Sequence, residues 1–155
     1  MSMKKTYLTT SPFQTKNLGE KIAREILASP KKEKAEIVGL IGELGSGKTT
    51  FLKGFAKGLG IKEKILSPTF IIMRKSKIQN PKSKFQYLYH IDCYRIKQPK
   101  EVLELGFKEI ISAPQNIVCI EWADKIKKIL PKGTILLKFS FLGKNKRRIT
   151  RRVLS

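Results

Sequence analysis

One short segment constrains the fold of this chain more than any other. Residues 42–49 read Gly-Glu-Leu-Gly-Ser-Gly-Lys-Thr and match the pattern G-x-x-x-x-G-K-[ST] at every fixed position. The match follows a short apolar run, Glu36–Ile41, and opens a segment, Lys48–Leu59, whose apolar residues recur at helical spacing. A glycine loop between a buried strand and a helix is typical of α/β proteins, and its backbone binds phosphate groups.

Each fixed position of this loop suits a triphosphate with its magnesium ion. The glycines let consecutive backbone N–H groups approach phosphate oxygens where a Cβ would intrude. Lys48 carries a positive charge to the β- and γ-phosphates, and the hydroxyl of Thr49 is a ligand for Mg²⁺. We therefore predict that ATP and Mg²⁺ are bound here. The predicted nucleotide-binding residues of the loop are Gly42, Glu43, Leu44, Gly45, Ser46, Gly47, Lys48, Thr49 and Thr50.

The remaining elements extend the α/β pattern along the chain. Predicted strands cover Lys5–Thr9, Glu36–Ile41, Phe70–Met73, Phe85–Asp92, Asn116–Glu121, Thr134–Phe141 and Arg147–Val153. Predicted helices run from the Ser11 cap to before Pro30, then over Lys48–Leu59, a broken stretch Glu101–Ile111, and Ala123–Leu130. Strands alternate with helices near the loop and form hairpins elsewhere. We expect one P-loop NTPase-like domain over residues 1–155, with three layers and a mixed central sheet.

Two carboxylates at the ends of predicted strands are candidates for the second part of the site. Glu121 follows four apolar residues, as the magnesium-binding acid of a P-loop protein does. Asp92 is a second candidate, either as a further magnesium ligand or as the base that orients the attacking water. The competing interpretation of each acid is a salt bridge to a lysine.

Three neighbouring residues allow both a functional and a structural interpretation. Thr69 is either a switch hydroxyl for Mg²⁺ or phosphate, or part of an ordinary strand entry after Ser67-Pro68. Trp122 either stacks beside the nucleotide or belongs to the core. His90 shares a strand face with Asp92, and we expect it to pack or form a hydrogen bond rather than bind metal.

The net charge of +21 draws polyanions to the surface and is compatible with an RNA partner. The excess consists of 26 lysines and seven arginines, and the lysines are spread along the chain, which a general lysine bias also explains. A dense basic patch occurs only in residues 144–152. No apolar run approaches the ~20 residues of a membrane span, and we expect a cytoplasmic protein.

Five segments in this order resemble the bacterial TsaE family. They are Gly-Glu-Leu-Gly-Ser-Gly-Lys-Thr-Thr at 42–50, Ser-Pro-Thr-Phe at 67–70, His-Ile-Asp-Cys-Tyr-Arg at 90–95, Glu-Leu-Gly-Phe at 104–107 and Glu-Trp at 121–122. The resemblance covers nearly the whole chain, although the final hairpin matches poorly. The chain departs from the usual family pattern at two of these positions, with Cys93 in place of a leucine and Glu43 in place of an aspartate. Neither change alters a side chain proposed as a ligand of phosphate or Mg²⁺.

The resemblance implies an ATPase required for threonylcarbamoyladenosine modification of tRNA at adenosine 37. It implies that Lys48 and Thr49 bind phosphate and Mg²⁺, that Thr69 belongs to a switch, and that Asp92 is needed for hydrolysis. It makes Glu121 the magnesium ligand and places Trp122 beside the site. It also implies slow hydrolysis alone, action with the TsaB and TsaD subunits, and at most weak or indirect contact with tRNA. We expect a monomer alone.

Two other functions share these features. A small-molecule or nucleotide kinase has the same loop, but it usually carries an arginine-rich lid, and Arg95 is the only arginine in the proposed motifs. A basic RNA-binding protein with a vestigial nucleotide site is a third possibility, and the intact Lys48, Thr49, Asp92 and Glu121 argue against it.

Overall fold

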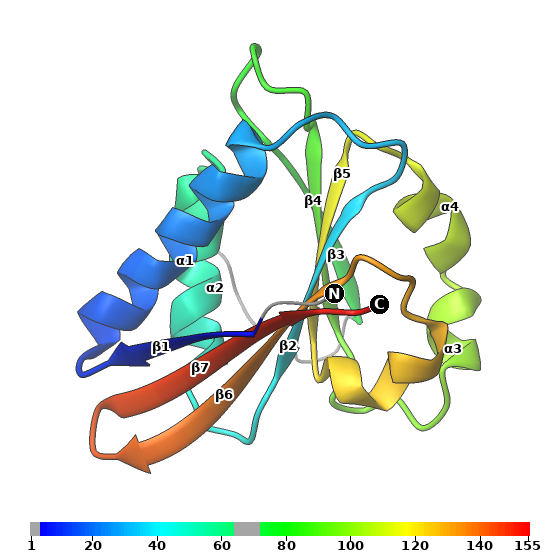
Figure 1. Ribbon diagram of the computed structural model, residues 1–155. Helices are drawn as coiled ribbons and strands as arrows, with labels where there is room; N and C mark the ends of the chain where they lie inside the picture. Colours follow the sequence, from blue (N-terminus) through cyan, green and yellow to red (C-terminus); the bar gives the residue numbers. More distant parts are fainter. Residues whose placement is uncertain (1–3, 64–71) are drawn as a thin grey trace.

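A seven-stranded mixed sheet forms the centre of the molecule (Figure 1). The computed structural model describes residues 4–63 and 72–155. The strand order is β1-β7-β6-β2-β5-β4-β3, in which β6, β2, β5 and β4 run parallel and the other pairings are antiparallel. The strands are β1 Lys5–Thr9, β2 Glu36–Ile41, β3 Met73–Lys77, β4 Tyr87–Asp92, β5 Asn116–Glu121, β6 Ile135–Gly143 and β7 Lys146–Val153.

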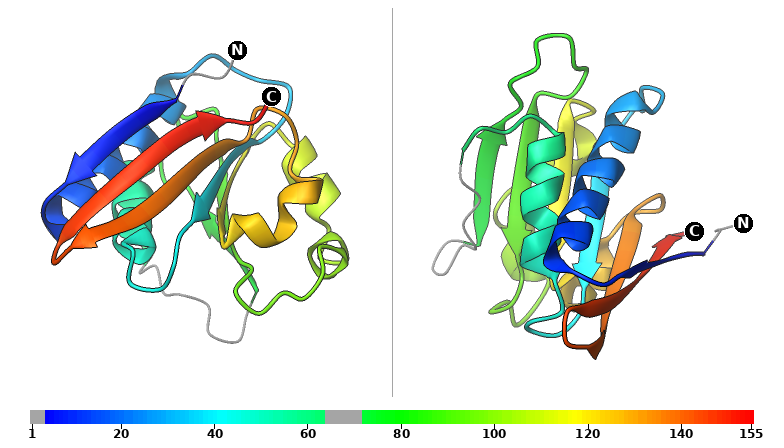
Figure 2. Two further views of the ribbon diagram at one scale, coloured as in Figure 1. Left: turned by 60° about the horizontal axis from the view of Figure 1, so that its bottom comes forward. Right: turned by 90° about the vertical axis from the view of Figure 1, so that its left-hand side faces the viewer.

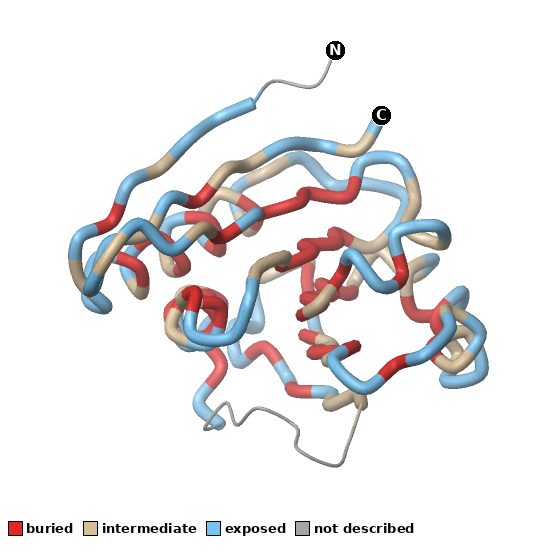
Figure 3. Tube along the Cα trace, turned by 90° about the horizontal axis from the view of Figure 1, so that it is seen from below, coloured by how far each residue is buried: buried red, intermediate tan, exposed pale blue. Residues whose placement is uncertain are grey.

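Helices cover both faces of the central strands and complete three layers (Figures 1 and 2). One face carries α1 Pro12–Ala28 and α2 Lys48–Gly58, and the other carries α3 Lys100–Leu103, α4 Phe107–Ser112 and the 3-10 helix η1 Ala123–Ile129. Two buried apolar clusters, one on each face, lie between the layers, and the buried segments of the chain follow the central strands (Figure 3). The predicted three-layer α/β fold with a mixed sheet is therefore confirmed.

The first helix begins as the sequence predicts. The hydroxyl of Ser11 accepts a hydrogen bond from the backbone N–H of Gln14 at 3.1 Å, and the Gln14 side chain accepts one from the N–H of Thr10 at 2.7 Å. The bond to Ser11 satisfies a first-turn donor that has no partner within the helix, and the bond from Thr10 fixes the residue before the cap. Among the described residues, no helix is both long and apolar enough to cross a bilayer.

Close packing of α1 against α2 fixes the helix that follows the glycine loop. A Cβ added at Gly54 would lie 1.8 Å from the backbone oxygen of Lys16, so only glycine permits the two backbones to approach this closely. Phe51 and Phe55 of α2 are fully buried against the sheet. The start of α2 is thus held by contacts on both sides of the helix.

Three predicted elements differ from the structure. The predicted strand Phe70–Met73 falls partly outside the described part, which omits residues 64–71; of its two described residues, Ile72 is a bend and Met73 begins a strand that continues to Lys77. As an edge strand that pairs with β4 alone among the described strands, Met73–Lys77 needs few apolar residues, so apolar periodicity did not identify it. The strand predicted from Phe85 begins at Tyr87, and the predicted helix Ala123–Leu130 is a 3-10 helix with a kink at Ile126.

Candidate nucleotide-binding site

The glycine loop joins the carboxyl end of β2 to the first turn of α2. Gly45 and Gly47 have φ values of 77° and 104°, in the left-handed region that favours glycine. Gly47 is the N-cap of α2 and has no side chain, so the N–H groups of the first turn receive no side-chain cap. The hydroxyl of Ser46 is buried and has no hydrogen-bond partner. An uncapped helix start beside an unsatisfied hydroxyl fits an anionic ligand such as phosphate.

Lys48 lies in the middle of this site and is only 5% exposed. Its ammonium donates hydrogen bonds to the carbonyl oxygens of Gly42 and Glu43 and lies 3.9 Å from the centre of the Trp122 ring. Burial lowers the pKa of Lys48, and the nearby carboxylates, Glu121 foremost, oppose that shift. Trp122 itself adopts a left-handed backbone with φ 58° directly after β5. Its ring lies beside Lys48 and is also partly buried against an apolar cluster, so its place next to the nucleotide stays a prediction.

The two predicted acids lie side by side at the ends of adjacent parallel strands. The register pairs Asp92 of β4 with Glu121 of β5, and Glu121 with Leu40 of β2 one residue before the end of that strand. The carboxyl edge of a parallel sheet is where ligands of α/β proteins bind. Burial raises the pKa of Asp92, while a hydrogen bond from the N–H of Tyr94 to the Asp92 carboxylate at 3.0 Å acts in the opposite direction.

Glu121 is held in place by the single histidine of the chain. Nε2 of His90 and Oε2 of Glu121 are 2.7 Å apart, and both side chains are almost fully buried. The prediction that His90 packs or forms a hydrogen bond is confirmed by this contact. One carboxylate oxygen of Glu121 is thereby fixed, which leaves Oε1 for another ligand.

The residues present fit a P-loop magnesium ion better than a metal held by protein alone. No group of three or more His, Cys, Asp or Glu residues that could hold a metal occurs in the described part of the chain. Mg²⁺ in P-loop proteins takes one hydroxyl and one or two carboxylates, and substrate phosphates and waters complete its shell. Thr49 in the first turn of α2, with the carboxylates of Glu121 and Asp92 at the ends of their strands, would be the protein groups for such an ion. Thr69, the predicted switch residue, lies outside the described residues.

Arg147 is a residue of the site that the sequence analysis did not assign. From β7 it reaches the glycine loop, where Nη2 donates to the carbonyl oxygen of Gly45 at 3.0 Å, and its Nε is buried without a partner. Together with Gly47, Thr50 and three other residues it lines a shallow cavity of about 30 Å³. Thr50, which was predicted to contact the nucleotide, therefore borders a depression beside the loop. No local sequence signal distinguishes Arg147 from its basic neighbours.

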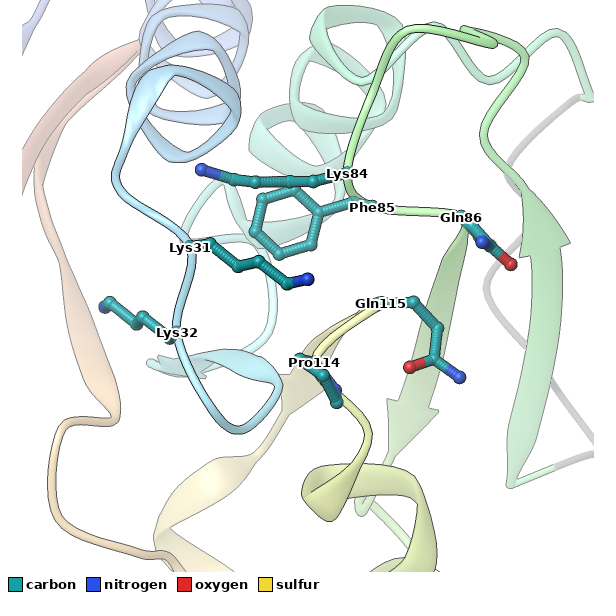
Figure 4. A pocket seen from close by; sticks show the side chains of 7 residues that line it. All are labelled: Lys31, Lys32, Lys84, Phe85, Gln86, Pro114 and Gln115. Carbon is teal, nitrogen blue, oxygen red and sulfur yellow. The ribbon is translucent and has the colours of Figure 1, made fainter.

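A second cavity, of about 380 Å³, lies at the opposite edge of the sheet (Figure 4). Its lining comes from the segments that precede β2, β4 and β5, and it consists of Lys31, Lys32, Lys84, Phe85, Gln86, Pro114 and Gln115. It has no glycine loop and no carboxylate in its wall. The candidate nucleotide site is therefore the other edge, where Lys48, Asp92 and Glu121 meet.

The fold and this loop define a nucleotide-binding protein of the P-loop class. Comparison with known proteins narrows the class: the family model described as "Threonylcarbamoyl adenosine biosynthesis protein TsaE" matches residues 9–151. The chain therefore belongs to the TsaE family.

Relatives of this chain carry the same family name. The tRNA threonylcarbamoyladenosine biosynthesis protein TsaE of Rickettsia typhi is 37% identical over 138 residues, which cover 88% of this chain and 87% of that protein. Its counterpart from Bacillus subtilis is 35% identical over 142 residues, covering 92% and 81%. The crystal structure of Bacillus subtilis YdiB superposes with a TM-score of 0.75 at 29% identity, over 100% of this chain and 88% of that one.

Proposed function

We propose that this chain hydrolyses ATP with Mg²⁺ and thereby supports threonylcarbamoyladenosine formation at adenosine 37 of tRNA, together with TsaB and TsaD. The observation that carries the proposal is the meeting of Lys48, Asp92 and Glu121 at one edge of the sheet, where all three charges act on one another. Membership of the TsaE family supports the assignment to tRNA modification.

Different groups of the chain would bind the phosphates and the magnesium ion. The N–H groups of the loop and the first turn of α2 surround the phosphates, and Lys48 turns from the Gly42 carbonyl toward the β- and γ-phosphate oxygens. Thr49 and Glu121 would hold the magnesium ion, which would supply positive charge to offset the charge that develops on the phosphate oxygens. His90 fixes the orientation of Glu121 through its 2.7 Å contact.

We assign to Asp92 the role of the base that orients the attacking water. Its carboxylate lies beside Glu121 at the strand ends, and burial makes it a stronger base than an exposed aspartate because its pKa is raised. It accepts a hydrogen bond from the water and orients the oxygen toward phosphorus. Thr69, if it enters the site as a switch hydroxyl, would add a further ligand to the magnesium or the γ-phosphate.

Phosphate release from ATP tests the function as a whole. We expect slow, magnesium-dependent release by the purified chain and faster release when TsaB, TsaD and tRNA are added. Transfer of phosphate to an added metabolite instead of water, without any response to the partners, would identify the kinase alternative.

A further inference from the structure

Three strands at one side of the sheet have a face that the described helices leave largely uncovered. The cover begins at Leu136 of β6, which pairs with Arg152 and is buried in the apolar cluster that includes Ala123 and Ile126 of η1. β1, β7 and β6 are neighbours, and α1 lies behind them (Figure 2). Successive side chains of a strand point to opposite faces. Arg151 of β7 bonds Glu25 of α1 at 2.7 Å, so the odd-numbered residues of β7 face α1. Arg148, Thr150 and Arg152 therefore point to the uncovered side.

The pairing register adds residues of the neighbouring strands to this side. Lys138 of β6 lies beside Thr150, while Leu8 of β1 and Ser140 of β6 flank Arg148. We call this uncovered surface the open face. It comprises Thr6, Leu8, Lys138, Ser140, Arg148, Thr150 and Arg152.

The open face is cationic and contains no acid. β1, β6 and β7 include neither Asp nor Glu, and no ion pair found in the described residues involves Lys138, Arg148 or Arg152. A lysine bias does not explain the patch, because four of the seven arginines of the chain lie within β7. Two of the four, Arg147 and Arg151, are engaged on the other face, and two remain on the open face.

The side chains of the open face select one kind of polyanion. Arg148 and Arg152 are four residues apart, so their Cα atoms are separated by about 13 Å, with Lys138 between them one strand away. Cations and hydroxyls at this spacing suit the phosphates of a nucleic-acid backbone. No aromatic ring belongs to the face. Tyr7 and Phe139 lie on the α1 side, and the exposed Phe141 pairs with Arg147, whose guanidinium lies 4.8 Å from the centre of the Phe141 ring. Without a ring for base stacking, the face suits a base-paired backbone better than single-stranded bases.

We propose that the open face binds the phosphate backbone of a base-paired RNA stem. This inference rests on the proposed function, which makes a structured RNA the natural polyanion for this chain. The open face would bind RNA directly, whereas ATP would be hydrolysed at the nucleotide site. The face ends beside the nucleotide loop, because Arg148 directly follows Arg147, whose guanidinium bonds the Gly45 carbonyl.

Two charge-matched triple variants test the proposal. The first variant, K138Q/R148Q/R152Q, neutralises the open face. The control, K31Q/K82Q/K84Q, neutralises two lysines that line the cavity of Figure 4, Lys31 and Lys84, together with Lys82, two residues from Lys84 in the sequence. Each variant removes three charges from the net charge of +21. Affinity for a fluorescent RNA stem-loop is measured by anisotropy at several salt concentrations, with an unstructured RNA of equal length as the second probe.

We expect the open-face variant to bind the stem-loop at least about tenfold more weakly. The slope of the logarithm of affinity against the logarithm of salt concentration should become shallower by about two to three. The control should change affinity by no more than about twofold. If both variants weakened RNA binding equally, the loss would follow from the lower net charge and not from the open face, and the proposal would be overturned. An unchanged affinity of the open-face variant would also overturn it, as would a loss confined to binding of TsaB and TsaD, which would make the face a protein interface.

Hydrolysis separates this proposal from the proposed function. Both triple variants should release phosphate from ATP at the wild-type rate without RNA, because none of their residues is among the predicted nucleotide-binding or catalytic residues. If the wild-type chain binds the stem-loop through the open face but hydrolyses no ATP, the proposed function fails while the RNA surface stands. If ATP hydrolysis is normal but the open-face variant binds RNA as tightly as the wild type, only the assignment of the RNA-binding surface fails.

Discussion

Replacing His90 by alanine tests whether Glu121 depends on its buried partner. The variant removes the group that lies 2.7 Å from the Glu121 carboxylate and leaves that carboxylate in a site where it is only 4% exposed. A lost hydrogen bond to a charged group costs about 1.5–3 kcal/mol, and the space left by the ring adds to it. We expect a fall of about 2–4 kcal/mol in the free energy of unfolding, a large part of the roughly 5–15 kcal/mol of a typical domain.

The functional effect is expected in magnesium dependence. Partners that orient metal-binding carboxylates typically contribute about 10–100-fold to metal affinity or activity. We therefore expect H90A to need about 10–100-fold more Mg²⁺ for half-maximal phosphate release at saturating ATP. H90Q, whose amide can still donate to the carboxylate, should recover most of this loss. Urea unfolding supplies the stability comparison under the same conditions. If H90A and the wild type show the same magnesium dependence while stability falls, His90 only supports packing and our account of Glu121 is wrong.

Three further variants test other contacts. G54A places a Cβ 1.8 Å from the Lys16 carbonyl oxygen, and we expect a loss of more than about 3 kcal/mol in urea unfolding because two backbones must separate. R147A removes the donor to the Gly45 carbonyl, and we expect ATP affinity measured by calorimetry to fall about tenfold as the loop loses a fixed contact. D92N should unfold at higher urea concentration than the wild type at neutral pH. The folded state favours protonated Asp92, so ionisation destabilises the fold as pH rises through the raised pKa, and the difference should vanish in acid.

Each of these variants has a matched control. K53A changes an exposed residue of the same helix as Gly54 and should leave stability within about 0.5 kcal/mol. R151A removes an arginine of the same strand that bonds Glu25 instead of the loop, so it should leave ATP affinity unchanged. For Asp92, a stability gain that persists at low pH would show that the amide acts through packing and not through charge.

Local chemistry explains which parts of the structure were predictable. The glycine loop and the Ser11 cap are specified by residues within a few positions of one another, so their patterns identify them directly. Asp92 and Glu121 end apolar runs, and parallel pairing of those runs necessarily brings both acids to one edge. The sequence therefore predicted the two acids as neighbours of the loop.

Contacts between distant segments were not predictable in the same way. Arg147 bonds a carbonyl 102 residues away, and nothing in the basic run distinguishes it from Arg148 on the opposite face. The approach of α1 to α2 at Gly54 depends on the geometry of two helices, which no helical periodicity reveals. The strand β3 is polar because it lies at an edge, a property that belongs to the sheet and not to the segment.

The most direct test of our account compares ATP binding and phosphate release in the same samples of wild type, K48A and D92A. We expect K48A to lose ATP binding, and D92A to bind ATP with nearly wild-type affinity while phosphate release falls by at least about a hundredfold. That separation would assign phosphate binding to Lys48 and activation of water to Asp92. Normal phosphate release by D92A would contradict the mechanism, and normal ATP binding by K48A would contradict the assignment of the site.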